Sequence, residues 1–484
     1  TIRDKDPNLT PAPVPHRGSL HYCEEEQAEA LAEHLEVQFS AQITADPHTR
    51  CFRNRWFETL KFHPGHPLNT DVTVNEVWKL IRDASIRKAP GPDLIPTLIL
   101  KLLPISGLTI LTKLINYVLK LLHFPVPWKM ATVIMIPKPS KPQHLPGNRR
   151  PISLLPSMAK VAEKIILNRM LPLMQAIIPE HQYGYQPEIS TTQAILQLLE
   201  YGCRHFRNKH PPRVIFLDLN KAFDTVDHPT LINTLENAGF PESWTKLLVS
   251  YLSNRKFKVR IGNHLSSTKS MSTGVPQGSR IGPYLFLLHS SGIPAPMDRN
   301  STFQTYVDDV MLGTHGRGAD RRLQLHLDRI RTWATDRNIS INPQKSQAIA
   351  LRTRRNPPAP QWGAQRIAYM NKITYLGIDM VKSLSKLPHL QRVRKKAPTL
   401  SRVCRALNFA ANPTTALHLY KQLVRPTLEY AVAALRPLPI TYGRRYRSAH
   451  LNQVKRLLGI PIRSPKGPLT NELRLDDPLT RLQT

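Results

Sequence analysis

The spacing of hydrophobic positions predicts two helices near the start of the chain. Between residues 24 and 40, apolar residues recur every three or four positions, which is typical of an amphipathic helix. A second helix is expected to begin near Val74. Thr73 is a suitable N-cap residue there, and Glu76 follows three residues after it.

Further along, short apolar runs alternate with helical stretches and Pro/Gly turns as far as residue 380. The runs at residues 133–136 and 214–217 are compact and suit buried strands. Residues 354–366 form a basic connector that contains proline, and residues 385–459 are helical and rich in Arg and Lys. This alternation predicts an α+β fold.

The charge of the chain adds a functional constraint to this pattern. Lys and Arg number 67 against 34 acidic residues, which gives a formal net charge of +33. Such an excess repels itself unless a polyanion neutralises it, and nucleic acid does so with release of counterions. Because the basic residues occur along the whole chain, they favour a long nucleic-acid channel. The alternatives are a merely soluble basic protein or one attracted to an anionic membrane.

The cysteines and the apolar segments exclude two other classes. Cys23, Cys51, Cys203 and Cys404 lie far apart, without the spacing of a metal site, and are interpreted as free thiols of a reducing compartment. No segment approaches the roughly 18 consecutive apolar residues of a membrane span. The sequence therefore predicts no membrane association.

The first candidate catalytic residue is Asp218, which directly follows the apolar run at residues 214–217. An apolar strand thus ends at a carboxylate, and a helix is expected to follow. Taken alone, this arrangement is also typical of a carboxylate that caps the next helix. Both interpretations stay open at this point.

The second candidate segment spans residues 303–313, where two apolar runs flank the pair Asp308 and Asp309. This pattern predicts a hairpin with both carboxylates at its turn. Paired aspartates can be simple turn formers. Here the flanking residues are apolar, so the like charges would repel each other on a buried sheet, and no adjacent residue is basic. A bound cation would offset that repulsion.

Together, these carboxylates suggest a metal site. Oxygen ligands from separate strands suit Mg²⁺, which takes one or two carboxylates together with waters and substrate phosphates. Two such ions, ~3.5–4 Å apart, would stabilise the attacking and leaving oxygens of an in-line displacement. We therefore expect Asp218, Asp308 and Asp309 to bind two Mg²⁺ ions, with Mn²⁺ as an alternative.

These residues also carry a family resemblance. Residues 306–309 (Tyr-Val-Asp-Asp) resemble the metal box of reverse transcriptases, and the segment around Asp218 resembles their first catalytic motif. Other segments resemble further boxes of the family, at residues 88–93, 128–138, 149–155, 163–166, 181–186, 190–194, 273–279, 342–346, 375–378 and 419–431. The chain is most similar to reverse transcriptases of non-LTR (LINE-type) retrotransposons, and its last box to jockey-like elements.

The resemblance implies roles for residues around the carboxylates. Phe223 would crowd the sugar 2′-position and select deoxynucleotides, although a Phe just after a strand is otherwise ordinary core. Gln277 and Gly278 would line the nucleotide pocket, where glycine lets the backbone approach a ligand closely. The alternative for this box is an ordinary loop-to-helix junction.

Three cations receive roles from the same resemblance. Lys138 and Arg150 would reach the incoming triphosphate, or would be exposed cations that touch template phosphate or solvent. Lys345 would act as a catalytic residue that protonates pyrophosphate, or would be a cation on a helix surface.

The implied architecture is a right-hand polymerase with fingers, a palm of antiparallel sheet with helices, and a helical thumb. It would copy an RNA template into DNA by adding deoxynucleoside triphosphates to a DNA primer or nicked target, inside the cell, in nucleus and cytoplasm. In the family an endonuclease domain precedes the polymerase, and no segment here resembles one. The chain is interpreted as the polymerase segment of a larger or decayed open reading frame, either continuous with that upstream domain or missing it. The expected segments are an N-terminal extension with the amphipathic helix (1–70), fingers (71–205), palm with the catalytic core (206–380), thumb (385–460) and C-terminal tail (461–484).

Some residues depart from the family pattern and keep other functions open. Arg280 stands where apolar residues usually follow Gln277 and Gly278, and Val307 stands where non-LTR enzymes more often carry Ala. The competing hypotheses are a catalytically silent, decayed or domesticated nucleic-acid-binding descendant, a group II intron maturase, and a metal-dependent nuclease. Retention of all three aspartates argues against the silent descendant. The boxes at residues 190–192 and 425–430 fit the LINE type better than a maturase, and a nuclease would not need the box at residues 275–278.

Overall fold

The computed structural model describes the chain in two compact units. The described residues are 14–16, 19–40, 54–55, 57–60, 68, 71–139, 141–406, 412–431 and 438–481. The first unit comprises residues 1–180, 219–294 and 329–342, and the second comprises residues 181–218, 295–328 and 343–484. Cys51 lies outside the described residues. Because the chain passes between the units several times, each is assembled from segments that are distant in sequence.

The sheet of the first unit is built around β3 (Met130–Pro137), which contains the predicted strand 133–136. It pairs antiparallel with β4 (Arg149–Leu154) and parallel with β6 (Arg255–Ile261). β6 pairs in turn with two short strands, β7 (His264–Leu265) and β8 (Lys269–Met271). The strands that resemble fingers boxes therefore share one sheet with β6, which lies about a hundred residues further along the chain.

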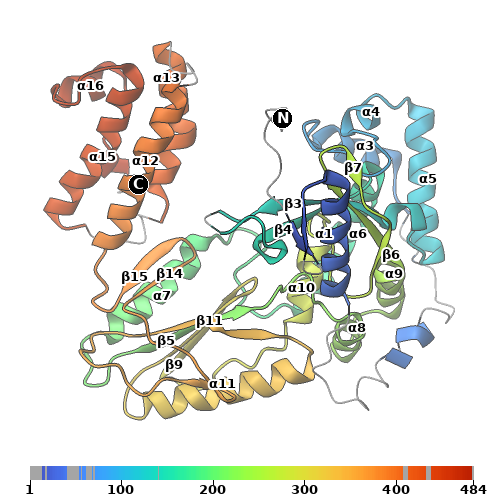
Figure 1. Cartoon of the computed structure of the whole chain (residues 1–484), viewed down its shortest axis with the longest axis horizontal. Helices are drawn as coiled ribbons and strands as arrows, with labels where there is room; N and C mark the ends of the chain where they lie inside the picture. Colours follow the sequence, from blue (N-terminus) through green and yellow to red (C-terminus); the bar gives the residue numbers. More distant parts are fainter. Residues whose placement is uncertain are drawn as a thin grey trace. The chain divides into compact units, whose positions relative to one another are not determined.

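The predicted amphipathic helix is confirmed as α1 (Glu24–Gln38), which lies beside this sheet (Figure 1). Its apolar face contributes Leu31 and Leu35 to a buried cluster that includes Val133 of β3. Phe39, just after the helix, makes an edge-on contact with Phe257 of β6, with ring centroids 5.3 Å apart. Removal of this apolar surface from water is the main force that holds the helix on the sheet.

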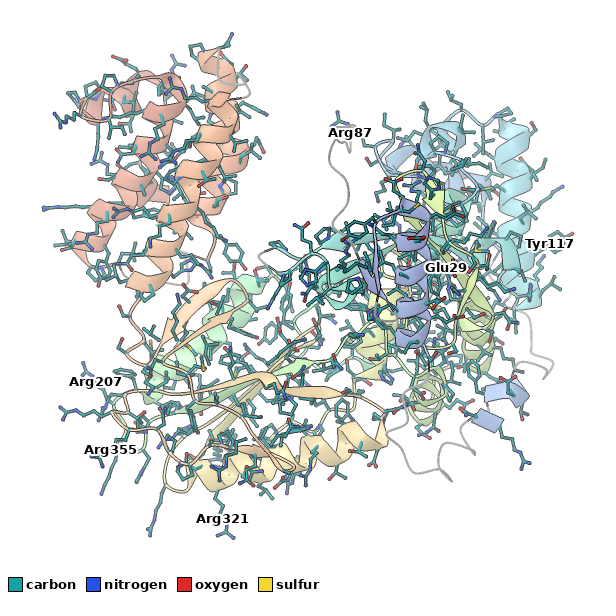
Figure 2. The ribbon with its side chains drawn as sticks, viewed as in Figure 1. Glu29, Arg87, Tyr117, Arg207, Arg321 and Arg355 are labelled. Carbon is teal, nitrogen blue, oxygen red and sulfur yellow. The ribbon has the colours of Figure 1, made fainter. Side chains whose placement is uncertain are left out.

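Glu29 adds a polar contact to the same interface, and Figure 2 labels it on α1. Its carboxylate accepts hydrogen bonds from the Ser267 N–H at 2.8 Å and hydroxyl at 2.7 Å, and it pairs with Lys269 Nζ at 2.9 Å. Partial burial acts to raise the pKa of Glu29, but these contacts outweigh it and lower the pKa from 4.5 to about 2.

A pH-dependent loss of stability should follow from this lowered pKa. Glu29 stabilises the fold above its unfolded pKa of 4.5, and that contribution disappears as the pH falls toward its folded value of about 2. Denaturant unfolding of Glu29→Gln should therefore differ from wild type at pH 6 and converge with it near pH 2. Glu25→Gln, at an exposed position of the same helix, is the control. An equal difference at both pH values would contradict the role of Glu29.

The remaining helices of the first unit pack on α6 or on one another. The second predicted helix is confirmed as α3 (Val74–Asp83), and Thr73 Oγ1 accepts a hydrogen bond from the Glu76 N–H at 3.2 Å. The Glu76 carboxylate pairs with Arg169 at 3.1 Å, which ties α3 to α6. The helices are α4 (Thr97–Lys101), α5 (Ile105–Leu121), α6 (Ser157–Ile177), α8 (His228–Asn237), α9 (Glu242–Leu252) and α10 (Gly282–His289).

The second unit contains a four-stranded sheet in the order β11-β5-β10-β9. Its strands are β5 (Arg213–Leu219), which contains the predicted run 214–217, β9 (Ser301–Tyr306), β10 (Asp309–Thr314) and β11 (Ile341–Ala350). Val214, Met311 and Ile349 from three of these strands form one buried cluster with Leu198 of α7 (Thr191–His205). Figure 2 shows Arg207, Arg321 and Arg355 of this unit, all exposed, extending away from the ribbon.

The C-terminal part of the second unit is helical, as predicted, apart from two small hairpins. The connector at 354–366 contains β12 (Gln361–Trp362) and β13 (Gln365–Arg366), and β14 (Lys372–Tyr375) pairs with β15 (Ile378–Val381). The helices that follow are α12 (Leu387–Ala406), α13 (Pro413–Leu419), the π-helical turn η3 (Tyr420–Val424), α14 (Arg425–Glu429), α15 (Ile440–Leu458), α16 (Gly467–Glu472) and α17 (Pro478–Arg481).

The fold class is thus a mixture of helices and mainly antiparallel sheets, as the sequence predicts. Cys23, Cys203 and Cys404 are free thiols, as expected for these three. Among the described residues, no helix is both long enough and apolar enough to cross a bilayer.

Candidate active site

The candidate carboxylates lie on neighbouring strands of the second unit. In the antiparallel register of β5 and β10, Asp218 stands directly opposite Asp309. Asp309 also faces Tyr306 of β9, so Val307 and Asp308 form the two-residue turn of the predicted hairpin. Residues that oppose each other in this way have Cβ atoms ~4.5–5.5 Å apart. The expected convergence of Asp218 with the 308–309 turn is confirmed, and the catalytic role of these residues stays a prediction.

The segment after Asp218 differs from the predicted one. Turns occupy residues 220–225, and α8 begins only at His228. The N-cap of this helix is Asp227, whose carboxylate accepts a hydrogen bond from the Thr230 N–H at 3.0 Å. The interpretation of Asp218 as a helix cap is therefore wrong, and the expected helix follows after a stretch of turns.

The electrostatics of the site are set by burial and like charge. Burial, followed by repulsion from Asp308 and Asp218, raises the pKa of Asp309 to about 7. Lys345 Nζ lies 3.8 Å from Asp218 Oδ2, so a cation that is distant in sequence does approach the cluster. Lys345 lies on β11, and its interpretation as a helix-surface cation is therefore wrong. Its neighbour Ser346 accepts a hydrogen bond from the Asp218 N–H at 3.1 Å.

The carboxylates fit a divalent cation that brings some of its own ligands. Among the described residues, no three His, Cys, Asp or Glu side chains are grouped closely enough to hold an ion by themselves. Mg²⁺ does not require such a group, because it usually binds one or two carboxylates and completes its shell with water and substrate phosphates. A cation between Asp218 and Asp309 would also offset the repulsion that raises the pKa of Asp309.

The predicted nucleotide-pocket residues belong to the first unit. The Gln277 carbonyl accepts a hydrogen bond from the Ser153 N–H of β4 at 2.7 Å. Gly278 has a φ of +129°, and a Cβ there would lie 2.4 Å from the Ser153 carbonyl oxygen, so this position requires glycine. The half-buried Phe223 packs against Phe286 of α10, with ring centroids 5.0 Å apart. The box is therefore a close-packed backbone junction.

Asp224, to which the sequence analysis assigns no role, holds Gln277 in place and is itself bound by Gln38. Asp224 is buried, and its carboxylate accepts hydrogen bonds from Gln277 Nε2 and from Gln38 Nε2, both at 2.7 Å. Burial raises the pKa of Asp224 to about 6 against the opposing effect of these bonds and of nearby lysines. Asp224 could have been noticed because it follows Phe223 directly. Gln38 gives no such signal, since it lies at the end of α1.

The two predicted triphosphate-binding cations lie at one end of the β3–β4 hairpin. Lys138 directly follows β3, and its Nζ donates a hydrogen bond to the Gly147 carbonyl oxygen at 3.0 Å. Arg150 is exposed on β4, opposite Ile136. Both cations are accessible to an anion, and their assignment to the triphosphate stays a prediction.

Comparison with known proteins identifies the family. The model of the family described as "Reverse transcriptase (RNA-dependent DNA polymerase)" matches residues 136–380, which is more than half of the chain and contains Asp218, Asp308 and Asp309. The chain belongs to the reverse transcriptase family.

Relatives of this reverse transcriptase include proteins of mobile elements. The probable RNA-directed DNA polymerase from transposon BS of Drosophila melanogaster is 32% identical over 398 residues, which cover 78% of the chain and 43% of that protein. The RNA-directed DNA polymerase from mobile element jockey of the same species is 30% identical over 460 residues, which cover 91% of the chain and 49% of that protein. The chain spans less than half the length of each of these relatives.

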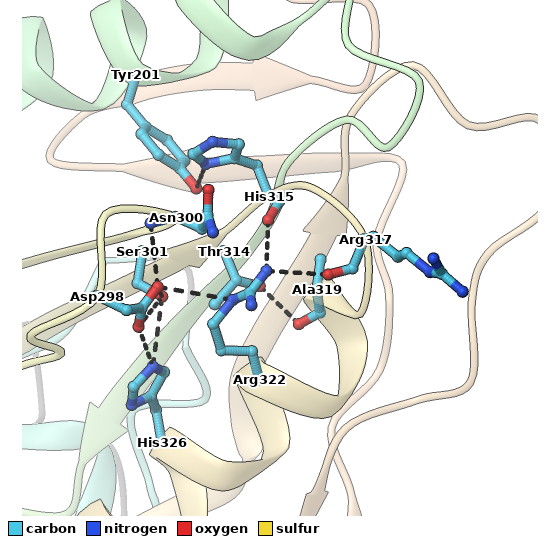
Figure 3. Close-up of polar contacts among 10 residues, drawn as sticks. All are labelled: Tyr201, Asp298, Asn300, Ser301, Thr314, His315, Arg317, Ala319, Arg322 and His326. Carbon is cyan, nitrogen blue, oxygen red and sulfur yellow. Dashed lines mark hydrogen bonds and ion pairs between the residues drawn. The ribbon is translucent and has the colours of Figure 1, made fainter.

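In this reverse transcriptase, a polar network fixes the end of the β9–β10 hairpin away from its turn (Figure 3). Asp298 accepts hydrogen bonds from Ser301 Oγ at 2.8 Å and contacts His326 Nε2 at 2.9 Å. Arg322 donates to the His315 carbonyl oxygen at 2.8 Å, just after β10 ends. Both strands are therefore tied to α11 (Ala319–Asp336), which carries His326 and Arg322.

Proposed function

We propose that the chain is an RNA-directed DNA polymerase of a non-LTR retrotransposon. It would extend the 3′-hydroxyl of a DNA primer or target with deoxynucleotides on an RNA template. The observation that carries this proposal is the pairing of Asp218 with Asp309 beside the turn that holds Asp308, inside a segment that matches the reverse transcriptase model. The excess of 67 basic residues over 34 acidic residues supports a polyanionic substrate.

The proposed chemistry assigns separate roles to the residues of the second unit. Two Mg²⁺ ions, or Mn²⁺ in their place, would supply charge stabilisation for the attacking 3′-oxygen and the leaving pyrophosphate. Asp218, Asp308 and Asp309 would hold these ions through anionic oxygen atoms. Lys345, 3.8 Å from Asp218, would donate a proton to the departing pyrophosphate.

The residues of the first unit would bind the incoming nucleotide. Lys138 and Arg150 would neutralise its triphosphate, and the box at Gln277 and Gly278 would form the pocket wall. Because Asp224 holds Gln277 Nε2, the side-chain oxygen of Gln277 is the atom left to meet a donor on the nucleotide. Phe223 would close the space beside the sugar 2′-carbon.

In the proposed right-hand layout, fingers span residues 71–205, the palm spans 206–380 and the thumb spans 385–460. The four-stranded sheet that carries the aspartates lies within the proposed palm, and the helices from α12 to α15 lie within the proposed thumb. The fingers strands β3 and β4 share their sheet with β6, which belongs to the residue range of the palm. An N-terminal extension (1–70) would contribute α1, and a tail (461–484) would follow the thumb. Leu469 and Leu475 of this tail pack in the same buried cluster as α12 and α15.

Sugar selectivity provides a test of the role of Phe223. Phe223→Ala should increase ribonucleotide incorporation relative to deoxynucleotides by on the order of tenfold, because a pocket enlarged by several carbon atoms no longer excludes a hydroxyl. The measurement is kcat/KM for each nucleotide in single-nucleotide primer extension. Phe223→Tyr, which keeps the bulk of the ring, should retain the wild-type selectivity. Unchanged selectivity in Phe223→Ala would show that this residue is only core.

The function itself is tested by primer extension with the purified chain. DNA synthesis is expected on an RNA template with a DNA primer, deoxynucleotides and Mg²⁺, and it should stop when the metal is chelated with EDTA and resume when Mg²⁺ is restored. Extension that persists in EDTA would contradict the metal site. Salt-sensitive RNA binding without any extension would favour the silent binding protein.

A further inference from the structure

The turn that carries Asp308 has an unfavourable backbone conformation. Val307, its first residue, has a φ of +59°. Two-residue hairpin turns with a positive φ at this position normally use glycine, because a β-branched side chain crowds the backbone there. Such a conformation costs on the order of 1–3 kcal/mol and persists only where the surroundings impose it. Contacts outside the hairpin must therefore hold the turn.

The side chain of Gln182 supplies these contacts. It is 3% exposed, and its Oε1 accepts hydrogen bonds from the Val307 N–H at 2.9 Å and from the Gly184 N–H at 2.7 Å. Its Nε2 points toward the Val307 carbonyl oxygen at 3.5 Å. One buried amide thus contacts both backbone polar groups of the strained residue.

The backbone around Gln182 fixes the position of this amide. The Thr305 N–H of β9 donates to the His181 carbonyl oxygen at 2.8 Å, and the Tyr183 N–H donates to the Thr305 carbonyl oxygen at 2.9 Å. The segment 181–183 therefore runs beside β9 as a short parallel bridge. All of these residues belong to the second unit.

Gly184 completes the arrangement because no side chain fits at its position. A Cβ on Gly184 would lie 2.4 Å from Val307 Cγ2 and 2.8 Å from the Val307 nitrogen. The segment 181–184 is thus in close contact with both the side chain and the backbone of Val307. A glutamine with an ordinary structural role would form hydrogen bonds with buried polar groups anywhere in the core. It would not need to bind Val307, the residue between Tyr306 and the two aspartates.

We infer that Gln182 is a positioning residue of the metal site. It holds the strained peptide at Val307, so that Asp308 and Asp309 present their carboxylates on the side of the sheet where Asp218 lies. This inference rests on the proposed function, because it concerns the affinity of the same aspartates for divalent cations. Under this inference, the box at residues 181–186 supports the turn that carries the metal ligands and need not contact the substrate.

The test replaces Gln182 with Met, which has a similar length but no hydrogen-bonding amide. Mn²⁺ binding, measured by electron paramagnetic resonance without substrate, should weaken by about tenfold, as is typical when a group that orients a metal ligand is lost. The value of kcat in primer extension should fall by a similar factor, with KM for the primer–template unchanged. The Asp308→Asn variant measures the Mn²⁺ that binds elsewhere on the chain, and this background is subtracted from the signal of each other variant.

A second substitution separates positioning from general stability. Glycine adopts a φ of +59° without strain, so Val307→Gly in the Gln182→Met background should recover most of the Mn²⁺ affinity. Gln304→Met is the matched control. Gln304 is a fully buried glutamine of β9 that donates to the Ala194 carbonyl oxygen at 2.9 Å, and its loss should lower stability without lowering Mn²⁺ affinity.

Three results would overturn the inference: wild-type Mn²⁺ affinity in a folded Gln182→Met, equal weakening in Gln304→Met, or no recovery with Val307→Gly. Thermal unfolding of each variant establishes that it is folded. Failure of the proposed function gives a different result, since wild type would then bind no more Mn²⁺ than Asp308→Asn. That outcome would remove the metal site itself, and the role of Gln182 with it.

Discussion

Primer extension is expected to fall at least about 100-fold when Asp308 is replaced by Asn, which corresponds to roughly 3 kcal/mol of lost transition-state stabilisation. The substitution keeps the size of the side chain but removes the anionic oxygen that a hard cation requires. Asp308 occupies the turn next to Asp309, which stands opposite Asp218. The measurement is the single-turnover rate of nucleotide addition on an RNA template.

RNA binding should survive this substitution, because the removed charge is negative and the 67 basic residues are untouched. The dissociation constant of Asp308→Asn should match wild type or be slightly lower, with the same dependence on salt. Asp476→Asn, at an exposed position after α16, makes the same chemical change and should extend normally. Equal extension by wild type and Asp308→Asn would refute the assignment of the site.

Glu163→Ala should lower the free energy of unfolding by about 3–5 kcal/mol, because it breaks a fully buried polar network. Glu163 lies on α6 and accepts hydrogen bonds from the Tyr251 hydroxyl at 3.0 Å and from the Arg280 N–H at 2.7 Å. Burial raises the pKa of Glu163, and these hydrogen bonds and the charge of the buried Arg255, 2% exposed, oppose that shift. Removal of the carboxylate leaves the Tyr251 hydroxyl and the Arg280 backbone N–H without this acceptor.

Chemical denaturation at pH 7 measures this loss, and Glu163→Gln provides the matched control. Glutamine keeps one side-chain oxygen as an acceptor but loses the negative charge, so its cost should lie between wild type and alanine. A loss of less than about 1 kcal/mol for Glu163→Ala would indicate that water replaces the carboxylate and that the network is not closed.

Local patterns in the sequence determined much of this protein. Hydrophobic spacing predicted the helix over residues 24–40 and the strands at 133–136 and 214–217. The reason is that a helix and a strand bury apolar residues at different spacings along the chain. The apolar runs around Asp308 and Asp309 determined the hairpin in the same way. The family resemblance assigned roles to Phe223 and Gln277, and these roles stay predictions.

Only the tertiary structure decided which distant side chains meet. It placed Lys345 beside Asp218 on a strand, made Asp227 the helix cap, and brought Gln38 to Asp224 and Gln182 to Val307. These contacts join residues that lie far apart in sequence or depend on where a turn ends. Periodicity records which face of an element is buried, but not which partner lies against it, because that choice depends on how all the elements pack together.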